Sequence, residues 1–244
     1  LQVIASSRNM INTKNLLGLG KKQGGEDDGF AFTDYNVVTN AWHYAALKQM
    51  EGIAGALGKQ DDVAFYASES DAFKKRFIRS FFDVRKGYFT DGLAADTDHA
   101  SLHGNMFPLA FDLVPAGKKQ NVVDFIQTRG MACSVYGSQF LMDALYEAND
   151  AEYALHMLTK TDDRSWYNMI RVGSTISLEA WDNKYKPNQD WNHAWGAAPA
   201  NIIPRRLMGV EPLTPGFGTA RIKPQLASLE WAEATIPTIR GAIR

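Results

Sequence analysis

The sequence lacks three features that would each have pointed to a class of protein. Cys133 is the only cysteine, so an internal disulfide and a cysteine-based zinc site are excluded. The net charge is −1, so no overall field favours nucleic acid or an anionic membrane surface. No run of about 18 apolar residues occurs, which argues against a transmembrane helix. We therefore expect neither a nucleic-acid partner nor a membrane partner.

Familiar catalytic motifs are missing as well. No G-x-S-x-G sequence occurs, which disfavours an α/β hydrolase. His99 and His103 have the spacing of a zinc-protease helix, but Ala100 stands where that motif requires glutamate. His103, which adjoins a predicted helix start, is the better candidate for a polar contact in a pocket. Cys133 lies in the apolar stretch "GMACSVYG" without an evident base, so we interpret it as a buried structural thiol.

The pattern of apolar residues is mainly helical. Residues 33–58 predict a long helix with Thr33 as N-cap and Gly58 as its stop, and residues 61–82 predict an antiparallel partner after a short turn. Residues 86–104 break the period and read as an extended loop. Further helical segments are 101–114 with Ser101 as cap, 116–130 with Pro115 in its first turn, the closely spaced pair 137–149 and 150–160, then 165–170, and 193–209, which Pro199 and Pro204 interrupt.

The period changes to near two after Phe217, which predicts short strands. Helical hairpins joined alternately by short turns and long loops are typical of an α/α toroid, but the helices are too few for six hairpins. We therefore predict a mainly α protein with two domains. Residues 1–215 would form a partial α/α toroid of the six-hairpin type, and residues 216–244 the start of a C-terminal β-sandwich domain.

The stretch 172–196, "VGSTISLEAWDNKYKPNQDWNHAWG", contains the candidate chemistry. Glu179 follows a run of small residues and is close in sequence to Trp181, with Trp191 and His193 following. An exposed or helix-capping glutamate is the ordinary interpretation of such a residue. A carboxylate partly desolvated by tryptophans would instead have the raised pKa and fixed position of a general base. His193 would then bind the same substrate or orient that carboxylate.

Several segments in this order resemble the α-L-rhamnosidase family of glycoside hydrolases, over about residues 10–240. The most specific are "DRSWYNMIRVGSTISLEAWD" and "DWNHAWGAAPANIIPRRLMGVEPLTPGFGTARIKPQL", and "FTDYNVVTNAWHYAAL", "GYFTDG", "SLHGNMFPLAF" and "RGMACSVYGSQFLMDALYEA" also match. The chain looks like the later part of the family's six-hairpin catalytic domain.

This resemblance implies an inverting bacterial enzyme that hydrolyses terminal α-L-rhamnosides, with a rhamnose-containing glycan or glycoside as substrate and neither cofactor nor metal. It implies that Glu179 is the general base and that His193 binds the sugar. Trp166 and Trp181 match aromatic positions that shape the rhamnose pocket, and Asp34 matches an acidic position near it. It also implies a periplasmic or extracellular location.

The sequence departs from the family in one respect. The family's general acid belongs to a segment rich in Asp, Arg and Glu that precedes the first hairpins, and no such segment occurs here. Because the chain begins at Leu1 rather than Met, we expect the acid on a missing upstream part of the same polypeptide. Two alternatives stay open: a carbohydrate-binding helical domain that has lost the acid, and a related six-hairpin enzyme with another sugar specificity.

Overall fold

The structure, a computed structural model, describes residues 28–244. Residues 1–27, the opening part of the predicted catalytic domain, lie outside the described residues. The chain divides into two compact units, one that ends at Arg129 and one that runs from Gly130 to Arg244. None of the helices described in residues 28–244 is both long and apolar enough to cross a membrane.

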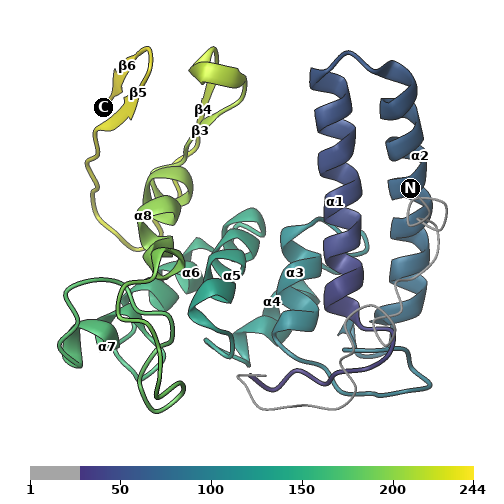
Figure 1. Cartoon of the computed structure of the whole chain (residues 1–244), viewed down its shortest axis with the longest axis horizontal. Coiled ribbons are helices and arrows are strands. Elements are labelled where there is room, and N and C mark those ends of the chain that lie inside the picture. Colours follow the sequence, from purple (N-terminus) through teal and green to yellow (C-terminus); the bar gives the residue numbers. More distant parts are fainter. Residues whose placement is uncertain (1–27) are drawn as a thin grey trace. The chain divides into compact units, whose positions relative to one another are not determined.

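The first unit is built on a helical hairpin. Helix α1 spans Val37–Ala56 and helix α2 spans Gln60–Phe81, and the two lie side by side (Figure 1). Gly58 has a φ of 71°, so it takes the left-handed conformation that lets the chain leave α1 and turn into α2. Phe73, Phe77 and other buried aromatic residues of α2 face the core. The hairpin predicted from the sequence is confirmed.

The predicted N-cap of α1 was wrong by three residues. The Asn36 side chain accepts a hydrogen bond from the Thr39 amide at 2.8 Å and caps the helix. The Thr33 hydroxyl donates instead to the carbonyl oxygen of Tyr35, in the loop before the helix. Both residues are good N-caps, so sequence preference alone does not distinguish them.

A small strand pair follows α2, at the end of the predicted second helix and the start of the predicted extended loop. Strand β1, Phe82–Asp83, pairs antiparallel with β2, Tyr88–Phe89. The remaining loop is tied down by Asp91, which is fully buried and accepts hydrogen bonds from the amide and the hydroxyl of Ser101 at 2.9 and 2.6 Å. Two-residue strands are too short to show a period in sequence.

Two shorter helices follow in the described part of the first unit. Helix α3 spans His103–Ala110, and the Ser101 hydroxyl accepts from the Gly104 amide at 3.0 Å, close to its predicted capping role. Helix α4 spans Lys119–Gln127, so Pro115 is not in its first turn as predicted. Pro115 accepts a turn hydrogen bond from the Lys118 amide at 3.0 Å, and the helix begins only after that turn.

The second unit begins with three capped helices. Helix α5 spans Val135–Glu147, α6 spans Ala151–Thr159 and α7 spans Trp166–Arg171. Their N-caps are Ser134, Asp150 and Ser165, whose side-chain oxygens accept backbone amides of the first turn. The closely spaced pair α5 and α6 is as the sequence predicts, with the fully buried Leu141, Leu145 and Tyr146 on α5.

A long loop without regular structure, residues 172–193, leads to the last helical segment. A 3₁₀ turn, Ala194–Ala197, continues into α8, Ala198–Ile202, and then into a π turn, Ile203–Leu207. The predicted interruption near Pro204 is present as this π turn, in which the Met208 amide donates to the carbonyl oxygen of Ile203 at 2.8 Å.

The chain ends in short antiparallel pairs. Strand β3, Val210–Pro212, pairs with β4, Ala220–Ile222, and β5, Ile236–Thr238, pairs with β6, Gly241–Ile243 (Figure 1). Strand β3 begins at Val210, before Phe217, after which the sequence pattern predicted the strands to start. The predicted fold class, helical hairpins followed by a small β region, is confirmed.

Candidate functional site

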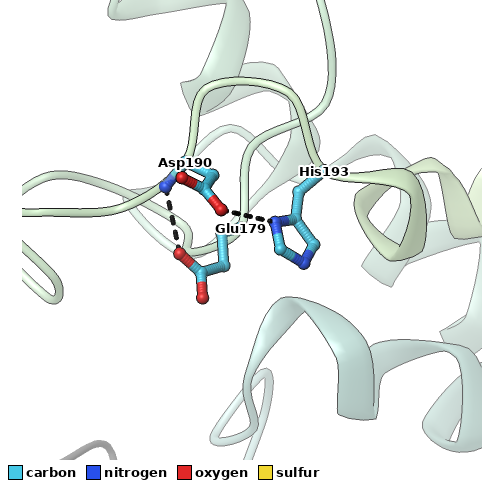
Figure 2. A group of neighbouring side chains, drawn as sticks. All are labelled: Glu179, Asp190 and His193. Carbon is cyan, nitrogen blue, oxygen red and sulfur yellow. Dashed lines mark hydrogen bonds and ion pairs between the residues drawn. The ribbon is translucent and has the colours of Figure 1, made fainter.

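The two ends of the long loop in the second unit run side by side. The His193 amide donates to the carbonyl oxygen of Ser177 at 2.9 Å, and the Glu179 amide donates to that of Asp190 at 3.1 Å. The Ser177 hydroxyl adds a bond to the carbonyl oxygen of His193 at 2.7 Å. This pairing places the side chains of Glu179, Asp190 and His193 together (Figure 2).

Small and buried residues hold the pairing in place. Leu178 is fully buried between Ser177 and Glu179. A Cβ atom on Gly196 would lie 2.5 Å from the carbonyl oxygen of Leu178 and 2.8 Å from Ser177 Cβ, so only glycine allows this approach. Gln189, 7% exposed, accepts from the Ala180 amide at 2.9 Å through its Oε1 atom. These contacts therefore fix the backbone on both sides of Glu179.

Both oxygens of the Glu179 carboxylate have donors. Oε2 accepts from the Asp190 amide at 3.0 Å, and Oε1 accepts from the Lys186 ammonium group. The Glu179 side chain is 17% exposed. On the other side of Asp190, its Oδ2 atom lies 3.5 Å from His193 Nδ1, within ion-pair range (Figure 2). We call Glu179, Lys186, Asp190 and His193 the Glu179 cluster.

The electrostatics of Glu179 correct one expectation. The hydrogen bond from Lys186 and then the one from the Asp190 amide lower the pKa of Glu179, and together they outweigh the effect of partial burial, which raises it. A raised pKa through flanking tryptophans was therefore the wrong expectation. The carboxylate bonds the Lys186 ammonium group and its pKa is lowered, so it is ionised at neutral pH.

The two tryptophans predicted to shape a sugar pocket lie against each other. Their ring centroids are 5.2 Å apart in an edge-to-face arrangement. Trp181 is only 1% exposed and donates from Nε1 to the carbonyl oxygen of Cys133 at 2.7 Å. Its ring offers almost no surface to a ligand, so the predicted sugar contact of Trp181 is corrected to a packing role. Cys133 itself is fully buried, as predicted.

Trp166 keeps part of its ring accessible. Its Nε1 atom donates to the carbonyl oxygen of Gly196 at 2.9 Å, which fixes the ring against the segment after His193. It lines a surface pocket of about 310 Å³ together with Ile170, Ile176 and other residues of the second unit. Its contact with a sugar stays a prediction.

The remaining predicted site residues belong to the first unit. Asp34 is exposed and lines a surface pocket of about 370 Å³ with Thr33, Tyr35, Leu93 and Asp96. His103 opens α3, is half-buried, and has its ring 6.2 Å from that of Phe30 and 6.3 Å from that of Phe107. The sugar contacts proposed for Asp34 and His103 also stay predictions.

The Glu179 cluster also places potential metal ligands together. Glu179, Asp190 and His193 have ligand atoms within 4.8 Å of one another. One Glu179 oxygen, however, already bonds the Lys186 ammonium group, so a cation at this point would have to displace the lysine. The donor set is equally suited to sugar hydroxyl groups, for which carboxylates and imidazole are ordinary hydrogen-bond partners.

Sequence reasoning missed several residues of this region. Lys186 had no signal, because a lysine in a polar loop is usually solvated. Asp190 precedes His193 by three residues and was quoted without a role. Trp195 and Tyr136 are 43% and 48% exposed, and the Trp195 ring lies 4.1 Å from the His193 ring and 5.0 Å from that of Tyr136. These exposed rings form an aromatic surface beside the cluster.

Comparison with known proteins gives matches along most of the chain. A family model described as the bacterial alpha-L-rhamnosidase 6 hairpin glycosidase domain matches residues 7–207, and one described as the bacterial alpha-L-rhamnosidase C-terminal domain matches residues 209–244. An alpha-L-rhamnosidase from Alteromonas sp. (strain LOR) is 29% identical over 231 residues, which cover 86% of this chain and 24% of the relative. The chain thus spans about a quarter of the length of the curated relative it matches.

Solved structures give the same fold. The GH78 family rhamnosidase of Bacillus sp. GL1 is similar over 98% of this chain and 27% of its own, with a TM-score of 0.71 and 19% identity. The alpha-L-rhamnosidase from Dictyoglumus thermophilum is similar over 75% of this chain and 21% of its own, with a TM-score of 0.66 and 21% identity.

Proposed function

We propose that this chain, which belongs to the bacterial α-L-rhamnosidase six-hairpin glycosidase family, supplies the general base of an inverting glycosidase that removes terminal α-L-rhamnose. The observation that carries the proposal is the Glu179 carboxylate. The carboxylate is ionised, and backbone hydrogen bonds of its loop hold it beside Asp190 and His193. The substrate class comes from the family and from the name of the Alteromonas relative.

In an inverting glycosidase, two carboxyl groups stand about 6.5–9.5 Å apart. One protonates the leaving oxygen, and the other removes a proton from a water molecule that attacks the opposite face of the sugar. The acid of such a pair usually has a raised pKa. The lowered pKa of Glu179 therefore supports the role of base rather than acid. We propose that the acid is a carboxyl group on another part of the polypeptide.

The neighbours of Glu179 have supporting roles in this proposal. His193 would hydrogen bond to a sugar hydroxyl group, since its ring is only partly buried and lies within the Glu179 cluster, 3.5 Å from Asp190. The exposed rings of Trp195 and Tyr136 would pack against the apolar face of a sugar or of its leaving group. Trp181 would act only through the position of the loop, because it is buried. A periplasmic or extracellular location stays a prediction.

The decisive variant is Glu179→Gln, made in the natural polypeptide that contains these residues and assayed on an aryl α-L-rhamnoside. We expect kcat to fall about 10²–10⁴-fold, the usual range for loss of acid–base assistance, while rhamnose binding persists. Glu230→Gln, at an exposed glutamate, is the matched control and keeps full activity. Turnover within a few fold of wild type in Glu179→Gln would rule out this residue as the base.

The same protein separates the competing functions. NMR of the first sugar released reports the configuration at the anomeric carbon, and inversion is expected. Binding of L-rhamnose without turnover by the whole polypeptide would favour a carbohydrate-binding role instead. Turnover of another aryl glycoside in preference to the rhamnoside would assign a different sugar specificity to the same residues.

A further inference from the structure

Lys186 is the side-chain cation that bonds the Glu179 carboxylate. Its ammonium group bonds Oε1, while Oε2 is taken by the Asp190 amide. The Lys186 side chain is 38% exposed and that of Glu179 is 17% exposed, so the pair lies at the edge of the protein rather than in its core. The lysine has no place in the mechanism proposed above.

The backbone of Lys186 is fixed, although its side chain is long. The Lys186 amide donates to the carbonyl oxygen of Asp182 at 3.4 Å, and its own carbonyl oxygen accepts from the Gln189 amide at 3.1 Å. Asp182 is held in turn by Asn168, a fully buried residue of α7 that donates to the Asp182 carboxylate at 2.9 Å. The lysine therefore extends from a turn that is anchored to a helix.

The two donors to Glu179 differ in kind. The Asp190 amide belongs to the backbone pairing and holds Oε2 in place. The Lys186 ammonium group carries a full positive charge, so it fixes the rotation of the carboxylate and favours its charged form. The other titratable side chains beside Glu179 in the cluster are Asp190 and His193, which face each other across 3.5 Å.

We propose that Lys186 is a positioning residue for the general base, whose ammonium group orients the Glu179 carboxylate and maintains its negative charge. The inference rests on the proposed function of Glu179. Without the ammonium group, the Asp190 amide would be the remaining donor to Glu179 among residues 28–244. The carboxylate could then rotate, and its Oε1 atom could take up a proton.

The experiment compares Lys186→Met and Lys186→Gln with Lys184→Met in the natural polypeptide. Lys184 is the matched control, since it lies in the same loop but pairs with Asp163 rather than with Glu179. The measurement is the pH profile of kcat/KM on an aryl α-L-rhamnoside. Thermal unfolding of each variant checks that the fold is intact.

Loss of the Lys186 ammonium group raises the pKa of Glu179. Both Lys186 variants are therefore expected to move the acidic limb of the kcat/KM profile to higher pH. A displacement of one pH unit lowers kcat/KM about tenfold on the acidic side of the limb. Lys184→Met is expected to leave the limb at its wild-type position. Lys186→Arg, which keeps the charge, is expected to return the limb towards that position.

An acidic limb that stays at the wild-type pH in both folded Lys186 variants would overturn the inference. The Glu179→Gln variant, assayed beside them, separates this failure from that of the proposed function. If Glu179→Gln is inactive and the limb does not move, only the role of Lys186 is refuted. If Glu179→Gln stays active, the base itself is wrongly assigned and the inference about Lys186 is refuted with it.

Discussion

The indole Nε1 atom of Trp181 donates a hydrogen bond of 2.7 Å to the carbonyl oxygen of Cys133, 48 residues earlier in the chain. Both residues are buried, and Cys133 directly precedes Ser134, the N-cap of α5. The bond therefore ties the loop that carries Glu179 to the start of a core helix. Trp181, two residues after Glu179, therefore helps to fix the position of the proposed catalytic carboxylate.

Replacing Trp181 with phenylalanine is expected to destabilise the protein. The change removes the indole donor to the Cys133 carbonyl oxygen, which keeps the longer bond of 3.4 Å from the Arg164 guanidinium group. Loss of one such hydrogen bond costs about 0.5–1.5 kcal/mol. Chemical denaturation of the variant measures the free energy of unfolding. Trp231→Phe is the control, because Trp231 is 76% exposed and its replacement should change stability by less than about 0.5 kcal/mol. Equal stability of the two variants would contradict the anchoring role of Trp181.

The pH profile of the wild-type enzyme gives a second prediction. The Lys186 ammonium group and the Asp190 amide hold the pKa of Glu179 below its ordinary value. A base must be deprotonated, so activity is retained as the pH falls until Glu179 begins to take up a proton. We expect the acidic limb of kcat/KM below about pH 4.3, the ordinary value for glutamate. A limb clearly above this pH that disappears in Glu179→Gln would show that Lys186 does not control the carboxylate.

Much of the fold could be predicted from local signals. The helical segments predicted over 137–149, 150–160 and 165–170 are present as α5, α6 and α7, although α5 begins two residues earlier, at Val135. The turn at Gly58 follows from the same kind of signal. The start of α1 was misplaced because Thr33 and Asn36 are both good caps, and only the packed structure selects one of them.

The candidate site was predictable only in part. The resemblance pointed to Glu179 and His193, and the backbone pairing of residues 177–179 with 190–193 brings them together. The contact with Lys186 depends on the turn that begins at Asp182, which no periodicity reveals. The resemblance assigned Trp181 to the wall of a sugar pocket, but a matching sequence position does not reveal whether an indole faces the pocket or packs behind it, as the 1% exposed Trp181 does.

The charge network around Glu211 predicts how stability depends on pH. Burial raises the pKa of Glu211, but the hydrogen bond from Arg221 and the charges of Arg206 and Arg221 outweigh it, so the net pKa is lowered. Arg206 also bonds Asp143 of α5 at 2.7 Å, so the network joins the β3 strand to a helix. A carboxylate with a lowered folded-state pKa stabilises the protein above its unfolded pKa.

That stabilisation is lost as the pH falls below about 4.3, the ordinary glutamate value, and on through the lowered pKa of the folded state. Glu211→Gln is therefore expected to be less stable than wild type at pH 7 by about 1.5–3 kcal/mol, the range for hydrogen bonds to charged groups. The difference should shrink in acid. Thermal unfolding between pH 3 and 7 measures it, with Glu230→Gln as the exposed control. A difference from wild type that is independent of pH would contradict this account.

Replacing Gly196 with alanine is expected to damage both stability and activity. The new Cβ atom would lie 2.5 Å from the carbonyl oxygen of Leu178, so the backbone before Glu179 must move away. Overpacking of this kind costs about 1–3 kcal/mol, and the shifted carboxylate should lower kcat on an aryl α-L-rhamnoside.

Gly52→Ala in α1 is the matched control. A Cβ atom there meets nothing within 4 Å, and the change should stabilise the helix by about 0.5–1 kcal/mol. Chemical denaturation and initial rates of both variants test the prediction, and a Gly196→Ala protein as stable and as active as wild type would contradict the close backbone approach that places Glu179 beside His193.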